Sequence, residues 1–281
     1  AIAYDRASVA VARGYYHADH RDVAWMLNNL SDVLMGHGDY AAAEPLIRET
    51  LAMRERLFGD VHHEVAVSLG DLGRLLGTRG DHTGAEPLIR EALAVEKQVN
   101  GERSAFAHAF GDILVNCLGE QGRNAEAESI AQESLTLRRQ ALDEQHPDVA
   151  EGLQRLGQVR RRLGDHAGAE KLQREAQEIR TEIYGREHPS LLQGFTNLAW
   201  FRSEQGDEAG AALLLREAVA MRKKLLGGDH PSIVLDLWKL AVILDGQGDH
   251  LGAETALTEA ARIYDAARLR AGAGLERSTF Q

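Results

Sequence analysis

The sequence predicts an all-α fold in which antiparallel helix pairs stack into a solenoid, and three observations predict it. A period of 42 residues runs from His20 to Tyr264 without an insertion or a deletion. The six copies share one leucine position, and Gly38 and Ala43 recur at the same spacing. Apolar residues within each copy recur three and four positions apart, as on an amphipathic helix. Such a period is typical of stacked units that cannot bury their apolar faces alone. The shared leucines are Leu30, Leu72, Leu114, Leu156, Leu198 and Leu240.

The period also predicts the domain organisation. We expect one continuous solenoid over residues 1–271, followed by a flexible Gly-containing tail at 272–281. The chain begins inside a repeat, because Ala1 lies one period before Ala43, and this predicts an excised piece of a longer protein. The predicted units are a partial repeat at 1–19 and full repeats at 20–61, 62–103, 104–145, 146–187, 188–229 and 230–271.

Each repeat is predicted to hold two helices. In the first repeat, Leu27, Leu30 and Leu34 mark a first helix of about 16 residues, which ends at Gly38. A second apolar stripe then begins at Ala43. All five prolines are compatible with this assignment, because each is expected at or near a helix start, where a missing N–H is tolerated. Pro147, Pro189 and Pro231 come at the start of first helices, and Pro45 and Pro87 are predicted in the first turn of second helices.

These residues carry a family resemblance. The runs from Asp22 to Leu30 and from Gly38 to Leu46 resemble the 42-residue tetratricopeptide repeat of kinesin light chains, as does the His-Pro pair at His146 and its two later copies. The resemblance covers residues 1 to 268 and implies a right-handed superhelical solenoid that binds proteins. Because this repeat type also occurs in bacterial regulatory proteins, we expect a bacterial member of the family. The third repeat departs from the pattern at Ser104, Gly111 and Asn124, which predicts looser packing there.

Composition limits the partners. The formal net charge of −11 disfavours nucleic acid and anionic membranes, because those partners are bound by Lys and Arg. The single cysteine, Cys117, falls at a core position and cannot form an internal disulfide, which favours a reducing compartment. We find no apolar run long enough to span a membrane and no signal peptide. These features predict a cytoplasmic protein.

The sequence offers no recognisable reactive centre. It contains no phosphate-binding P-loop, and His63-Glu64 lacks the second histidine of a zincin motif. One histidine per repeat is interpreted as a helix-start residue rather than as a metal array. Cys117 and His108 lie on a helix interpreted as core, without an orienting acid. We therefore predict no enzyme, no catalytic or metal-binding residues and no cofactor.

A second stripe on the first helices is the candidate binding surface. It comprises positions 25, 28, 29, 32, 35 and 36 and their copies, and in tetratricopeptide arrays the resemblance implies that this side lines a concave groove. All three tryptophans, Trp25, Trp200 and Trp238, fall on it, and tryptophan is common among residues that dominate binding energy. The alternative is that the indoles fill space between helices as core.

Polar residues on the same stripe complete the candidate site. Amides could hold the backbone of an extended ligand, or could be solvated helix residues. The arginines and lysine could bind an acidic peptide or a phosphate, or could pair with acids such as Glu120 and Glu204. The candidates are Asn29, Asn116 and Asn197 among the amides, with Arg155, Gln158, Arg161, Arg162 and Lys239 in and near the fourth repeat.

The leading hypothesis is a non-enzymatic protein–protein interaction module that binds a peptide or partner segment of acidic or mixed charge. The alternative is a sensory or autoregulatory domain of a larger signalling enzyme, such as a kinase, protease or NTPase. RNA as a ligand rests on the Arg155–Arg162 cluster alone. A homodimer is a further hypothesis. The first helix lacks the preceding helix that would normally cover it, so it is expected to expose an apolar surface for a second copy, made of Tyr4, Val9, Val11 and Tyr15.

Overall fold

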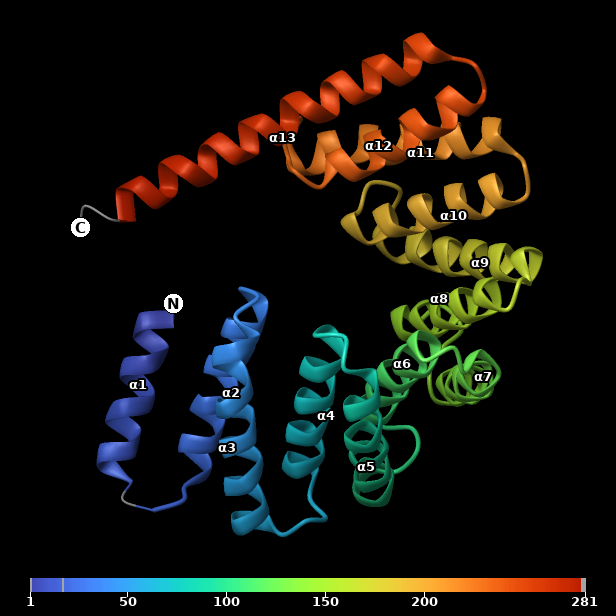
Figure 1. Ribbon diagram of the computed structural model, residues 1–281. Coiled ribbons are helices and arrows are strands. Elements are labelled where there is room, and N and C mark those ends of the chain that lie inside the picture. The colour runs from blue at the N-terminus through green and yellow to red at the C-terminus, as the bar shows by residue number, and fades with distance from the viewer. Residues whose placement is uncertain (1, 17, 279–281) are drawn as a thin grey trace. The chain divides into compact units, whose positions relative to one another are not determined.

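A computed structural model describes residues 2–16 and 18–278, with side chains described for 7–16 and 18–269 (Figure 1). The described residues are helical apart from turns and short links. They form two compact units, Ala1–Leu142 and Asp143–Gln281, which we describe separately. Whether the repeats form one continuous stack stays a prediction.

The first unit contains seven helices in its described residues. Each packs against the next along the chain, so that the order in sequence is also the order in space. The helices that begin the first three full repeats, α2, α4 and α6, each have the predicted 16 residues. The helices are α1 (Ile2–Tyr15), α2 (Arg21–Gly36), α3 (Tyr40–Phe58), α4 (His63–Thr78), α5 (His82–Asn100), α6 (Ala105–Glu120) and α7 (Asn124–Ala141).

The second unit continues the pattern with three further helix pairs. Consecutive helices again pack together, and a 3₁₀ turn, η1 (Pro189–Leu191), precedes the first helix of the fifth repeat. The helix pairs of both units confirm the predicted all-α solenoid of antiparallel pairs. The helices are α8 (Pro147–Arg162), α9 (His166–Tyr184), α10 (Leu192–Glu204), α11 (Glu208–Leu226), α12 (Ile233–Gly246) and α13 (His250–Ser278).

The repeated histidines begin the first helices. In His20, His62 and His146 the Nδ1 atom accepts a hydrogen bond from the backbone N–H two residues later, at 3.1 to 3.2 Å. His188 and His230 make the same contact at the start of their repeats. An N-cap acceptor satisfies a backbone donor that the helix itself leaves unpaired. The structural interpretation of these histidines is confirmed.

Glycine forms the turn inside each repeat, and aspartate follows it in every repeat except the third, which has Arg123. Gly38 has a φ of 78°, a conformation that costs glycine little, and its copies do the same. Asp39 then caps α3 by accepting a hydrogen bond from Ala42. Because the helix begins directly after this aspartate, Pro45 lies in the second turn of α3 rather than in the first. Pro87 lies equivalently in α5, so the predicted positions of these two prolines were one turn too early.

The repeated apolar residues form the core. The six shared leucines are buried, as are Ala43 and its copies, and Cys117 is buried as predicted. Met35 is also buried, although its position was assigned to the exposed stripe. It packs in the core cluster of the first unit, so the buried face of α2 includes this position. A small polar core exists as well, since the buried Arg54 donates to Ser68 at 2.7 Å.

One buried carboxylate ties three helices together. Glu96 on α5 is fully buried and contacts His63 of α4, with Nδ1 and Oε2 2.7 Å apart. It also accepts hydrogen bonds from Asn100 on its own helix and from Ser104, the N-cap of α6. Burial by itself raises the pKa of Glu96, but the hydrogen bonds together hold the pKa below its ordinary value of 4.5.

The two ends differ from expectation in part. Val9 is buried against the core rather than exposed, whereas Val11 and Tyr15 are exposed as predicted, and the side chain of Tyr4 lies outside the described residues. At the other end, α13 continues to Ser278, beyond the predicted start of the tail at 272. Ala, Leu, Glu and Arg favour helix there and outweigh two glycines. None of the helices in the described part combines the length and apolar character needed to cross a bilayer.

Candidate functional site

The three tryptophans lie on the surface. Trp25 on α2, Trp200 on α10 and Trp238 on α12 are 61%, 47% and 54% exposed. The alternative that they fill space as core is therefore wrong. Tryptophan is enriched among the residues that dominate binding energy, so these exposed indoles are candidate contact points.

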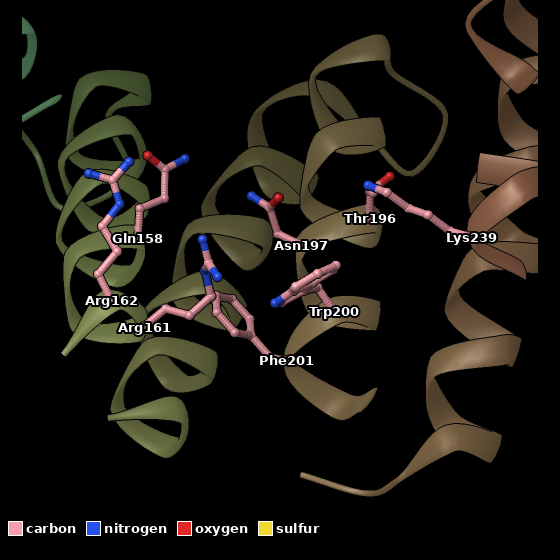
Figure 2. Close-up of a pocket in the computed structure, with 8 residues that line it drawn as sticks. All are labelled: Gln158, Arg161, Arg162, Thr196, Asn197, Trp200, Phe201 and Lys239. Atoms are coloured by element: carbon pink, nitrogen blue, oxygen red, sulfur yellow. The ribbon is translucent and has the colours of Figure 1, made fainter. Parts of the chain in front are cut away.

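A cavity surrounds one of these indoles. It has a volume of about 250 Å³ and lies in the second unit, between the first helices of three successive repeats, α8, α10 and α12 (Figure 2). We call it the Trp200 pocket. It is lined by Gln158, Arg161, Arg162, Thr196, Asn197, Trp200, Phe201 and Lys239. All but Thr196 and Phe201 were predicted site residues.

Arginine and tryptophan meet inside this pocket. The Arg161 guanidinium lies 5.8 Å from the centre of the Trp200 ring, within range of a cation–π contact (Figure 2). Arg161 also lies 3.7 Å from Glu204, which in turn contacts His166 at 2.7 Å. The predicted alternative of pairing with Glu204 is thus confirmed for Arg161, but at a distance that keeps the guanidinium beside the indole.

Hydrogen bonds fix the wall of the pocket formed by α10. Asn197 donates to Gln173 of α9 at 3.2 Å and accepts from Gln193 at 3.0 Å. These contacts use its carbonyl oxygen and one of its two N–H groups. One N–H of Asn197 therefore remains for a ligand.

A buried ion pair supports the same wall. Thr196 donates to Asp236 of α12 at 3.2 Å, and Arg222 of α11 donates to the other oxygen of that carboxylate at 2.5 Å. Asp236 is 1% exposed, so its charge is held by Arg222 behind the pocket rather than presented to a ligand. The arrangement links three helices around the cavity.

Two predicted residues of the second unit lie outside the pocket. Arg155 does not line it, because its guanidinium binds Glu151 one turn earlier on α8, at 2.8 Å. Trp238 neighbours the lining residue Lys239 on α12 but does not line the cavity itself. It forms an exposed apolar row with Leu235 and Val242, one helical turn apart.

The remaining predicted residues belong to the first unit. Asn29 is half-buried and Asn116 is exposed, on α2 and α6. On α4, the exposed surface carries an ion-pair cluster: Arg74 binds Asp71 of the same helix at 2.8 Å and Asp32 of α2 at 3.2 Å. Burial of Asp71 raises the pKa of its carboxyl, against the hydrogen bond from Arg74. Arg74 is thus paired with acids of α2 and α4. Trp25, Asn29 and Asn116 take no part in the Trp200 pocket.

Within the described residues, no three His, Cys, Asp or Glu side chains converge as a metal site requires. The groups gathered in the Trp200 pocket are an indole, cations and amides. Such groups can bind an aromatic surface, an anion or a peptide backbone.

The consecutive packing of helix pairs defines a helical-repeat solenoid, and the Trp200 pocket lies on the first helices of three of its repeats. The chain belongs to the tetratricopeptide repeat family, which it matches over residues 22–98, 107–180 and 148–224. Comparison with curated protein sequences gives no match.

Solved structures share the fold. The TPR-like repeats of a kinesin light chain from Podosopora anserina are 22% identical, with a TM-score of 0.63 over 73% of this chain and 98% of that one. BtubC (BKLC) from P. vanneervenii is 20% identical, with a TM-score of 0.66 over 82% and 90% of the two chains. A Rap protein complexed with Competence and Sporulation Factor is 12% identical, with a TM-score of 0.59 over 94% and 85%. The expected kinesin light chain type is thus matched by structural neighbours, whereas bacterial origin stays a prediction.

Proposed function

We propose that this chain is a non-enzymatic protein–protein interaction module that holds a peptide or partner segment across α8, α10 and α12. The observation that carries the proposal is the exposed Trp200, set in a cavity of about 250 Å³ among polar and cationic side chains. A rigid aromatic surface next to hydrogen-bonding groups is what a peptide-binding groove uses to anchor and orient its ligand.

The surface next to the pocket supports a segment longer than one residue. On α12, Leu235, Trp238 and Val242 are 56%, 54% and 54% exposed and lie one turn apart. Together they form an apolar row that continues from Lys239 at the edge of the pocket. A partner with an apolar part and a polar or acidic part would match both surfaces.

The similar folds are consistent with this role. The Rap protein of similar fold is complexed with Competence and Sporulation Factor, so a stack of this type can hold a partner. Concave surfaces that extend over several repeats are the general binding feature of such stacks. We expect the partner of this chain to contact successive first helices, α8, α10 and α12.

Peptide selection tests the proposal. Peptides displayed at random would be selected on the full chain and then measured by fluorescence anisotropy. Trp200→Ala and Trp238→Ala are expected to weaken the selected binders by about 10-fold or more, as truncation of an interface anchor does. Leu213→Ala on α11 is the matched control, because Leu213 is 60% exposed but lies on a second helix. Binders that tolerate both tryptophan substitutions and respond to Leu213→Ala would refute the proposed surface.

A further inference from the structure

The first unit contains a cavity of its own, in the third repeat. It has a volume of about 160 Å³ and is lined by α5 and α7, the second helices of successive repeats, and by α6, the first helix of the third repeat. Gly111 of α6 lies in its wall, where the other five repeats have leucine or phenylalanine. Leu27, Leu69 and Leu153 at this position are buried. The third repeat therefore lacks a large apolar side chain that the core contains elsewhere.

The interior of the cavity combines an apolar wall with a hydroxyl group that has no partner. Ser134 of α7 is 8% exposed, and no hydrogen bond to its hydroxyl exists within the described residues. A Cβ atom added to Gly111 would lie 3.9 Å from Ser134 Oγ, so this hydroxyl faces the space beside the glycine. The buried His108 of α6 also lines the cavity. A buried hydroxyl without a partner loses the hydrogen bonds it makes in water, and a ligand that bonds to it restores one. The apolar wall is formed by Leu93, Leu114, Ile130 and Leu137.

The cavity opens on a charged side. Glu102 and Glu133 are the exposed members of its lining. Lys97 of α5 pairs with Glu133 of α7 at 3.3 Å, and Arg90 of α5 pairs with Glu126 of α7 at 2.5 Å. The lining contains two cations and two acids, whose formal charges cancel, so the opening does not select a charged ligand. A peptide would have to bring its backbone against ion pairs that already connect α5 and α7, whereas a free small molecule would not.

The size and the chemistry of the cavity match a neutral single ring with one hydroxyl group. An apolar cavity of about 150 Å³ stays dry and is large enough to bind benzene. The cavity beside Gly111 has nearly this volume and adds one unpaired hydroxyl, that of Ser134. We propose that this cavity binds a free small molecule of the phenol class, with its ring between α5 and α7 and its hydroxyl bonded to Ser134. This inference does not depend on the proposed function, which concerns the second unit.

Fluorine NMR can measure the binding. The full chain would be titrated with 4-fluorophenol and with fluorobenzene, which lacks the hydroxyl group. Both are expected to bind saturably with a Kd of about 1 mM or below, because six ring carbons are removed from water. Bound 4-fluorophenol should also slow amide hydrogen exchange across α5, α6 and α7, since a ligand stabilises the state that binds it. If neither compound binds saturably, the proposal is wrong.

Substitutions of glycine locate the site. Gly111→Leu gives the third repeat the leucine of four other repeats and should abolish binding of both compounds. Gly111→Ala should weaken both at least about 5-fold, because the ring and the added methyl group compete for the same space. Gly77→Ala in α4 is the matched control and should leave binding unchanged. Its Cβ would lie 3.6 Å from Cys117 Sγ, an ordinary contact, and Gly77 does not line the cavity. Unchanged binding to the Gly111→Ala variant would place the compounds elsewhere and overturn the assignment.

The serine tests the chemical class of the ligand. Ser134→Ala should fold normally, because four of the other five repeats have alanine at this position. It should weaken 4-fluorophenol relative to fluorobenzene by about 5-fold, the size of one neutral hydrogen bond. Equal effects on the two compounds would show that the hydroxyl is not recognised and would overturn the phenol class. N-acetyltyrosinamide, which carries the same ring on a peptide backbone, should not displace 4-fluorophenol. Displacement as efficient as that by phenol would instead assign the cavity to a tyrosine side chain of a partner.

Discussion

The third repeat contains a void that a single methyl group should begin to fill. Four of the other five repeats have leucine at the position of Gly111, and the fifth has Phe195. A cavity of about 160 Å³ lies there between α5, α6 and α7. A Cβ atom added to Gly111 would meet only the Ser134 hydroxyl, at 3.9 Å, which is an ordinary contact. We predict that Gly111→Ala stabilises the first unit.

The magnitude follows from two additive effects. Replacing glycine by alanine inside a helix gains roughly 0.5–1 kcal/mol. Burying one additional carbon gains about 0.8 kcal/mol more. The variant should therefore raise the free energy of unfolding by about 1.5 kcal/mol. The matched control is Gly73→Ala in α4, where the added Cβ would lie 2.4 Å from Ile89 Cδ1 and 3.3 Å from the Ala85 carbonyl oxygen. Because Ile89 is fully buried, it cannot move aside cheaply, and overpacking costs roughly 1–3 kcal/mol.

Denaturant unfolding of the full chain, followed by circular dichroism, measures both variants. Amide hydrogen exchange across α6 and α7 then locates the effect, since stability in a repeat protein is largely a sum of local terms. Gly111→Ala should slow exchange there, and Gly73→Ala should lower the free energy of unfolding relative to Gly111→Ala by about 2 kcal/mol. If Gly111→Ala lowers the free energy of unfolding, or if the two substitutions have equal effects, the space at Gly111 does not accept a methyl group and the prediction is wrong.

Three further outcomes follow from the contacts of single residues. His146→Ala should cost about 1 kcal/mol by removing the acceptor for the backbone N–H of Asp148, and His146→Asn should recover most of it, as measured by denaturant unfolding. Because folding lowers the pKa of Glu96, its contribution to stability is present above pH 4.5 and is lost as the pH falls through the folded pKa. Glu96→Gln should therefore be less stable than the parent chain at neutral pH, and its free energy of unfolding should depend less on pH below 4.5. The same pH dependence in both proteins below pH 4.5 would contradict this. Arg138→Leu should cost about 3 kcal/mol by leaving the Asp112 carboxylate, 2.7 Å away, without its buried partner, whereas replacing both by leucine should recover much of the loss.

The scaffold could be predicted from the sequence because its determinants are local and repeated. Gly38 is needed where φ is positive and Leu30 where two helices meet, and both recur in all six repeats. Asp39, which accepts a hydrogen bond from a backbone donor, recurs in five, because the third repeat has Arg123 at that position. The errors arose where a boundary depends on one residue. Pro45 was placed one turn early because the helix starts immediately after its cap, and Met35 was assigned to the exposed side at the end of a helix.

The candidate site could be predicted only in part. Residues on the exposed stripe differ from repeat to repeat, because no common packing contact requires the same side chain in each copy. The stripe register identifies Thr196 as facing the pocket, but a threonine there gave no chemical signal, and Phe201 falls at a core position. Arg155 and Arg161 look alike as arginines of the same helix. Their difference depends on neighbours: Glu151 lies one turn before Arg155 and binds it at 2.8 Å, a pairing that i,i+4 spacing could have revealed.

Arg161 depends instead on the next repeat. Its contacts, the Trp200 ring at 5.8 Å and Glu204 at 3.7 Å, both lie on α10, one repeat further along the chain. A side chain that pairs within its own helix is withdrawn from the groove, whereas one that reaches the following repeat helps to form the groove wall. Exchanging Glu151 for glutamine should therefore release Arg155 without changing the Trp200 pocket, because Arg155 does not line it. Removing Glu204 should act directly on the pocket by increasing its positive charge and tightening the binding of an anion.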